Sequence, residues 1–240
     1  MAAESARDVG APFLAISLAE TSMAHAKRRV ISLFGAVVAV SALTAPAASA
    51  APAGPPPPGG VTFELANLTG PTGCQISGYA WTADATAFTV TYSRYQGRAG
   101  GGSAPADRWK RCVIALRVHA PSGYTYGIER TDYRGFADLA DGTTGTLKAR
   151  SYFPDRADSP VRDVLSLNGP YSGNWTAADE TLPEQVVYQP CGEIRSLFLH
   201  SELAVDLGTS DGSKASVMSL DSTDGSLKVT YRFAWKNCPR

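Results

Sequence analysis

Regular alternation of apolar and polar residues is the sequence feature that most constrains the fold. Residues 227–236 read LKVTYRFAWK, with an apolar side chain at every second position of the first nine residues. Successive side chains of a β-strand point to opposite faces, so this period of two predicts a strand with one buried face. The same alternation occurs in residues 86–92, 112–120 and 196–207. Helical periodicity is nearly absent.

Turn-forming sequences separate these segments. PSG, DGTTG, NGP and STDGS all supply the Gly, Pro, Asn, Asp and Ser residues that favour tight turns. Many short strands joined by such turns predict an all-β fold, an antiparallel β-sandwich, and a jelly-roll-like strand order is compatible with the pattern.

The N-terminal segment has the parts of a secretory signal peptide. A basic stretch ending at Arg29 precedes an uncharged apolar run over residues 30–44, and the small residues APAASA follow. We expect cleavage after Ala50. A signal peptide of ordinary length would begin at Met23, which we predict to be the true start, with residues 1–22 as an extension.

The remaining chain divides into a linker and one domain. Residues 51–60 read APAGPPPPGG, which favours polyproline II and predicts a semi-rigid tether. Residues 61–240 would form the secreted β-sandwich domain. Residues 51–240 carry 18 Lys and Arg against 19 Asp and Glu, a formal net charge of −1. This balance argues against a nucleic-acid partner and against electrostatic membrane binding after signal cleavage.

All four cysteines follow the predicted cleavage site, at Cys74, Cys112, Cys191 and Cys238. An even number of cysteines in an exported chain predicts two disulfides. Three pairings are possible. We favour Cys74–Cys112 and Cys191–Cys238, because these would staple the two halves of the chain separately. Each loop closure would contribute about 3–4 kcal/mol in the chain-entropy view.

The segment from residue 131 to 153 concentrates charged and aromatic side chains. We expect a hairpin around DGTTG, with Lys148, Arg150 and Tyr152 on its exposed face. The ordinary interpretation is a solvated charged face. The functional interpretation is a ligand-binding face built on Tyr133, Arg134 and Tyr152. Exposed aromatics at Trp109 and Trp175 would extend it, because flat aromatic rings stack on sugar rings.

Signals for catalysis are weak. Only His119 and His200 follow the predicted cleavage site, both on expected outward faces of strands, and no G-x-S-x-G motif occurs. His200, Glu202 and Asp206 would share a face and could hold a metal, although such a trio is more often surface decoration. The oxygen-rich turn at 221–225 is a weaker calcium candidate. We therefore predict no catalytic residues, no metal and no cofactor.

Several motifs carry a resemblance to a known family. A Lys-Arg-Cys start at residues 110–112, a Pro-x-Gly turn at 121–126 and a D-Y-R-G run at 132–142 resemble the secreted bacterial and fungal family called domain of unknown function 4360. The resemblance extends over residues 62–238. It implies an exported, disulfide-bearing all-β protein of unassigned activity and supplies no catalytic residues. The chain departs from the family pattern around Cys74 and in a glycine-rich insertion.

These observations favour an extracellular binding or surface protein whose partner is a polysaccharide or cell-wall component. Two alternatives stay open: a polysaccharide hydrolase that uses two carboxylates, and a purely structural or defensive secreted protein. Binding predicts exposed aromatic rings. Hydrolysis predicts a groove that holds two carboxylates with perturbed pKa values.

Overall fold

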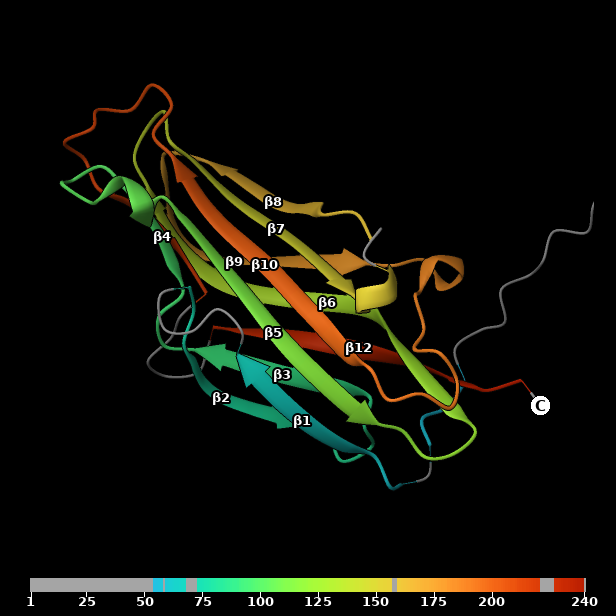
Figure 1. Ribbon diagram of the computed structural model, residues 1–240. Coiled ribbons are helices and arrows are strands. Elements are labelled where there is room, and N and C mark those ends of the chain that lie inside the picture. Colours follow the sequence, from blue (N-terminus) through green and yellow to red (C-terminus); the bar gives the residue numbers. More distant parts are fainter. Residues whose placement is uncertain (1–53, 58, 68–72, 157–158, 221–226, 240) are drawn as a thin grey trace, which may run out of the picture. The chain divides into compact units, whose positions relative to one another are not determined.

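A computed structural model describes residues 54–57, 59–67, 73–156, 159–220 and 227–239. The predicted signal peptide, the start at Met23, the cleavage site after Ala50 and the calcium candidate at 221–225 lie outside these residues. The described chain forms two antiparallel sheets with three single-turn 3-10 helices (Figure 1). These helices are η2 (Pro105–Asp107), η3 (Pro154–Arg156) and η4 (Pro183–Gln185). The prediction of an all-β antiparallel sandwich is confirmed.

The first layer is a five-stranded sheet. Its strands run in the order β1 (Thr62–Asn67), β5 (Trp109–His119), β10 (Ser196–Asp206), β7 (Thr144–Tyr152) and β8 (Arg162–Asn168). Strands β1 and β8 are therefore its edges.

The second layer is a seven-stranded sheet organised around one long strand, β6 (Tyr124–Leu139). One side of β6 pairs with β12 (Lys228–Asn237) and β11 (Ser216–Ser219), and the other side pairs with β9 (Tyr171–Glu180). Strand β12 continues to β3 (Ala87–Tyr92) and β2 (Ile76–Trp81), and β11 continues to β4 (Gln96–Ala99).

The core lies between the sheets and follows the predicted alternation. On β12, Val229, Tyr231, Phe233 and Trp235 are buried, and the Trp235 indole Nε1 donates to the backbone oxygen of Ala85 over 2.9 Å. The β12–β6 register slips by one residue after Arg232, because β6 carries a bulge there. Bulges of this kind bend a strand and increase its twist.

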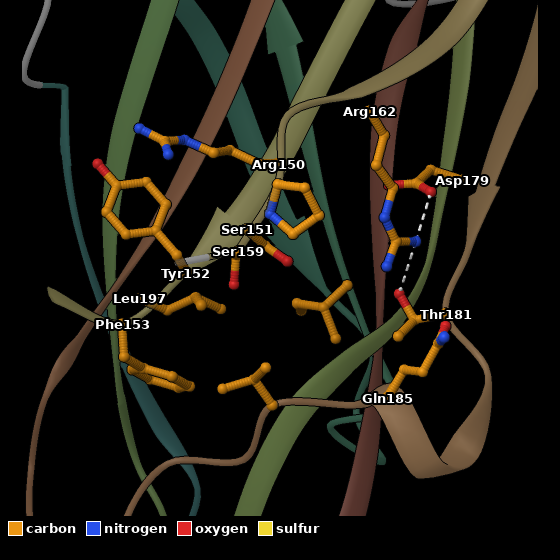
Figure 2. A pocket seen from close by; sticks show the side chains of 13 residues that line it. Arg150, Ser151, Tyr152, Phe153, Ser159, Arg162, Asp179, Thr181, Gln185 and Leu197 are labelled. Atoms are coloured by element: carbon orange, nitrogen blue, oxygen red, sulfur yellow. Dashed lines mark hydrogen bonds and ion pairs between the residues drawn. The ribbon is translucent and has the colours of Figure 1, made fainter. Parts of the chain in front are cut away.

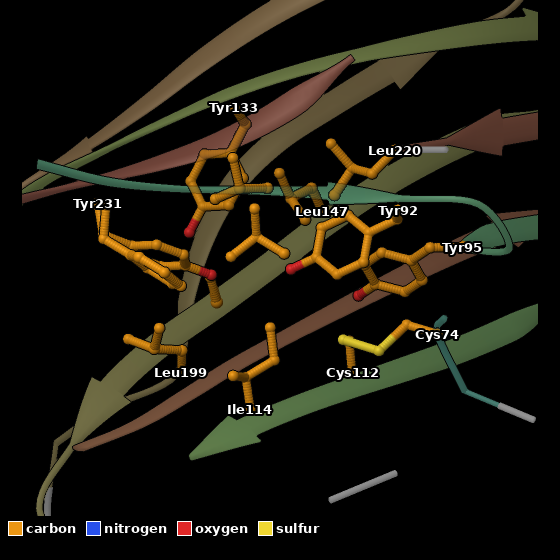
Figure 3. Packing of buried hydrophobic residues seen from close by; sticks show 14 of the residues in the cluster. Cys74, Tyr92, Tyr95, Cys112, Ile114, Tyr133, Leu147, Leu199, Leu220 and Tyr231 are labelled. Carbon is orange, nitrogen blue, oxygen red and sulfur yellow. A yellow bond between two sulfur atoms is a disulfide. The ribbon is translucent and has the colours of Figure 1, made fainter. Parts of the chain in front are cut away.

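The core also contains many tyrosines. Figure 3 shows Tyr92 and Tyr95 near the Cys74–Cys112 disulfide, with Tyr133 and Tyr231 elsewhere in the same cluster. The Tyr95 hydroxyl donates to the Ser201 hydroxyl over 3.0 Å. Burial raises the pKa values of all four phenols, so their protons are held more tightly than in water.

Both predicted disulfides are confirmed. Cys74 pairs with Cys112 at a Cα–Cα distance of 5.3 Å, and Cys191 pairs with Cys238 at 5.8 Å. The first bond is buried in the core, whereas Cys191 is exposed at the surface.

The predicted hairpin around DGTTG is wrong. Strand β6 belongs to the seven-stranded sheet and β7 to the five-stranded sheet, so the connecting turn crosses from one layer to the other. The physical reason is that both strands have an apolar face, and these faces meet across the core, with Tyr133 on β6 and Leu147 on β7 (Figure 3). The charged residues of the two strands therefore lie on opposite outer surfaces.

The proline-rich segment is not a free tether where it is described. The Gly54 amide donates to the Trp235 backbone oxygen over 2.7 Å, which forms an isolated antiparallel bridge, and Pro57 is buried. Glycine keeps the amide hydrogen that proline lacks, which explains why the bridge forms at this residue.

Candidate functional site

A cavity of about 320 Å³ opens at the edge of the five-stranded sheet (Figure 2). Strand β8 pairs with β7 only as far as the register Ala149↔Arg162. Beyond this point, no described strand pairs with the outer edge of β7, and the cavity occupies the gap. Unpaired strand edges present backbone N–H and C=O groups, which a ligand can satisfy. The lining residues are Ile128, Arg150, Ser151, Tyr152, Phe153, Ser159, Pro160, Arg162, Asp179, Thr181, Gln185, Val187 and Leu197.

Apolar side chains line one part of the cavity. They come from β6 (Ile128), the residue that follows β7 (Phe153), the segment after η4 (Val187) and the start of β10 (Leu197). Phe153 is fully buried and packs edge to face on Tyr126, with ring centroids 5.9 Å apart. This packing fixes the apolar part of the cavity to the core.

A guanidinium group forms the polar wall. Arg162 Nη1 donates to Asp179 Oδ1 over 2.9 Å, to the Glu180 backbone oxygen over 3.1 Å and to Thr181 Oγ1 over 3.3 Å (Figure 2). A guanidinium has five N–H donors in a fixed fork. Among the described residues, every hydrogen bond of Arg162 comes from Nη1, which leaves the donors on Nε and Nη2 for a ligand.

Arg150 and Tyr152 form the rim between the cavity and the outer surface of the sheet. The guanidinium carbon of Arg150 lies 4.4 Å from the ring centroid of Tyr152, a cation–π distance. The Tyr152 ring stacks on Phe198 at 5.4 Å and 20°. The Nε atom of Arg150 is buried and has no hydrogen-bond partner among the described residues. A buried unsatisfied donor of this kind is energetically unfavourable.

A strip of polar and aromatic side chains continues from this rim along the outer face of the sheet. His200 Nε2 lies 3.0 Å from Glu202 Oε1, and the indole Nε1 of Trp109 donates to Glu202 Oε2 over 3.3 Å. The Arg111 guanidinium lies 5.8 Å from the Trp109 ring. The cross-strand register Trp109↔Ala204 and Phe198↔Tyr152 places the two ends of the strip on the same face. We call Trp109, Arg111, Glu202, His200, Arg150, Tyr152 and Phe198 the outer strip.

His200 is less accessible than its predicted outward position implied. It lies on the outer face but is only 8 % exposed, because neighbouring side chains on β5 and β7 cover it. Burial lowers the pKa of His200, and the Arg150 and Arg111 charges add to this, whereas Glu202 acts to raise it. The neutral imidazole is therefore favoured at neutral pH.

The five sequence-predicted binding residues do not form one surface. Trp109, which is 49 % exposed, and Tyr152 lie at the two ends of the outer strip, whereas Arg134 is exposed on the outer face of the other sheet. Tyr133 and Trp175 are buried at 2 % and 4 % exposure, so the expectation that they point outward is wrong. Both belong to the inner face of the seven-stranded sheet. A ligand-binding role for Trp109, Arg134 and Tyr152 stays a prediction.

Sequence reasoning missed Arg162 and Asp179. They belong to edge strands of different sheets, β8 and β9, and only the packing of the two layers brings them together. The polar residues of β8 and β9 alternate as in any half-exposed strand, so no local signal distinguished these two.

Within the described residues, no group of three or more His, Cys, Asp and Glu side chains is arranged to hold a metal. His200 and Glu202 meet, but Asp206 does not join them as a third ligand. None of the helices in the described chain is long and apolar enough to cross a membrane.

Comparison with known proteins places the chain in a family. Residues 62–238 match the family described as Domain of unknown function (DUF4360). A relative from the fungus Arthroderma benhamiae, named "Uncharacterized secreted protein", is 26 % identical over 171 residues, which cover 70 % of this chain and 69 % of that protein. The matched region includes both disulfides and every strand of the two sheets. The chain therefore belongs to the DUF4360 family.

Proposed function

We propose that this protein acts outside the cell and binds polysaccharide, with the edge cavity as the site for one sugar residue. The observation that carries the proposal is the continuity of the cavity with the outer strip through Arg150 and Tyr152. If one sugar residue occupies the cavity, the neighbouring residues of the same polysaccharide would lie along the outer strip.

The chemistry of the cavity suits a sugar ring. Its volume of about 320 Å³ lies at the lower end of the range for small-ligand sites. Sugars combine apolar ring faces with many hydroxyl groups. Tyr152 offers aromatic surface, while Arg162, Asp179 and Thr181 offer fixed donors and acceptors.

The outer strip supplies further sugar contacts. Trp109 is held by its hydrogen bond to Glu202, so its exposed ring is preorganised for stacking. Rigid aromatic side chains lose little conformational entropy on binding. The strip also carries Arg111 and Arg150, which can donate to sugar hydroxyls.

An extracellular location is supported by three observations. The chain has two disulfides, which persist in oxidising compartments. A relative is named as a secreted protein. The N-terminal sequence has the composition of a signal peptide.

Binding is favoured over two-carboxylate hydrolysis at this site. Glycoside cleavage in the usual mechanism needs an acid and a second carboxylate on either side of the bond. Among the described residues that line the cavity, Asp179 is the single carboxylate, and it is engaged by Arg162.

The test is retention of the secreted protein on insoluble fungal, bacterial and plant cell-wall polysaccharides. Tyr152→Ala and Trp109→Ala should each lower retention at least about tenfold if each stacks on a sugar. Tyr79→Ala is the matched control, because Tyr79 is an aromatic side chain, 56 % exposed, on edge strand β2 of the other sheet. Retention on none of the polysaccharides, or equal loss in the control, would refute the proposal. Release of soluble sugars by the wild-type protein would favour the hydrolase instead.

A further inference from the structure

Four cations face one another on the outer surface of the seven-stranded sheet. The β12–β6 register places Lys228 opposite Arg134 and Arg232 opposite Arg130. Like charges directly opposite each other in an antiparallel pair are destabilising. A nearby anion would offset this repulsion. We call the two cross-strand pairs, Lys228–Arg134 and Arg232–Arg130, rungs, and they differ in whether the protein supplies such an anion.

The Arg130–Arg232 rung is neutralised by the protein. Asp132 accepts hydrogen bonds from Arg130 Nε over 2.6 Å and from Arg232 Nε over 2.9 Å, and Arg130 also pairs with Glu180. Burial acts to raise the pKa of Asp132, but the two arginines outweigh it and the pKa is lowered. Asp132, which lies opposite Thr230 between the two rungs, is therefore ionised at neutral pH.

Among the residues that the structure describes, nothing compensates the Lys228–Arg134 rung in this way. No ion pair joins either side chain to an acidic group of the described chain. Arg134 is exposed, and the residue opposite it on β9 is Thr176, whose side chain is also exposed. On β12, Thr230 contacts the Thr89 hydroxyl at 3.0 Å. Together these residues line a shallow hollow on the sheet.

We propose that the Lys228–Arg134 rung binds a sulfate or phosphate ester carried by an extracellular polysaccharide. Directly opposed residues have Cβ atoms about 5 Å apart, so both side chains can reach one tetrahedral oxyanion. The Arg134 fork can contact two of its oxygens, Lys228 adds a point charge, and the Thr176 hydroxyl can donate to it. In the neighbouring rung, Arg130 and Arg232 already donate to Asp132, so the proposed site consists of this pair.

This site is independent of the edge cavity, because it lies on the outer face of the other sheet. A protein with both sites could hold two polysaccharide chains at once, one by a sugar ring and one by a charged ester. Loss of one site would leave binding at the other unchanged.

The experiment compares binding to dextran sulfate, dextran phosphate and neutral dextran at low ionic strength. We expect binding to the charged dextrans, competition by excess inorganic phosphate, and no binding to neutral dextran at this site. Arg134→Ser combined with Lys228→Ser should lower the affinity about tenfold or more. The control removes two exposed cations elsewhere, Arg98→Ser with Lys214→Ser, and should change affinity less than about twofold.

A stability measurement separates a binding role from a structural one. Lys228→Glu creates an opposite-charge pair with Arg134, so it should raise the melting temperature and abolish binding to dextran sulfate. If the control variant Arg98→Ser with Lys214→Ser loses as much affinity, the loss reflects net charge alone and the proposal is overturned. Unchanged affinity in the Arg134/Lys228 double variant, or binding to phosphatidylglycerol vesicles without binding to either charged dextran, would also overturn it.

Discussion

Arg162 on β8 donates to Asp179 on β9 over 2.9 Å, and this ion pair joins the edges of the two sheets. It also forms the polar wall of the cavity. The same contact therefore stabilises the fold and shapes the candidate site.

Replacing Arg162 tests the structural part of this role. Arg162→Ala removes three hydrogen bonds from one guanidinium group, and we expect a loss of about 1–2 kcal/mol in the free energy of unfolding. Arg117→Ala is the comparison, because its ion pair with Glu64 is largely exposed and should contribute less than about 1 kcal/mol. Urea unfolding measures both. Equal losses in the two variants would contradict a special role for Arg162.

Gly135 allows the buried Trp175 ring to pack against β6. A Cβ atom at Gly135 would overlap the Trp175 ring and the backbone oxygen of Ser219. Gly135→Ala should therefore destabilise the protein by about 2–3 kcal/mol through overpacking. Gly102→Ala is not a matched control, because Gly102 has a positive φ of 82°. Gly212→Ala is the control, because Gly212 has open space around it and an ordinary φ. The thermal unfolding of this variant should be nearly the same as that of the wild type.

The two disulfides should differ in their accessibility to reductant. Cys191 is exposed, whereas Cys74 and Cys112 are both buried in the core. Limited reduction of the folded protein followed by alkylation should label Cys191 and Cys238 first. Mass spectrometry of the peptides identifies the order, and labelling of Cys74 or Cys112 first would contradict the described burial.

Alkaline pH should unfold the protein steeply. Burial raises the pKa values of Tyr92, Tyr95, Tyr133 and Tyr231 above their usual value of about 10, whereas the unfolded chain titrates near that value. Their contribution to stability is complete below pH about 10 and falls as the pH rises toward the folded-state pKa values. The loss approaches about 1.4 kcal/mol per tyrosine for each pH unit.

Denaturant unfolding at several alkaline pH values measures this slope. Tyr133→Phe removes one titrating group and should reduce the slope by about 1.4 kcal/mol per pH unit. Tyr79→Phe is the control, since it removes the same hydroxyl group from a side chain that is exposed. If the Tyr133→Phe variant and the wild type show the same slope of stability against pH, the burial of the Tyr133 phenol is contradicted.

The fold could be predicted from the sequence because its signals are local. Alternation shows which side chains of β10 and β12 face the core, and the spacing of the cysteines favoured the pairing that is observed. The partner of each strand is not a local property. Residues 141–143 make a tight turn whether the next strand stays in the sheet or crosses to the other, so the β6–β7 connection was predicted wrongly.

The candidate site was predicted less well for the same reason. Tyr152 alternates outward on β7 and was identified, but Arg162 and Asp179 are 17 residues apart and meet only when the sheets pack. Tyr133 was expected to point outward as part of a ligand-binding face in the charged segment 131–153, but it occupies a core position. Tyrosine is amphipathic, and its burial depends on the tertiary structure.

Hydrogen–deuterium exchange with a bound oligosaccharide tests the central claim most directly. The ligand would be a soluble fragment of a polysaccharide that retains the protein. We predict slower exchange at residues 150–153, whose outer strand edge faces the cavity, and no change at residues 79–81 on the far edge of the other sheet. Protection confined to residues 79–81, or no protection at residues 150–153 with saturating ligand, would contradict polysaccharide binding at the edge cavity.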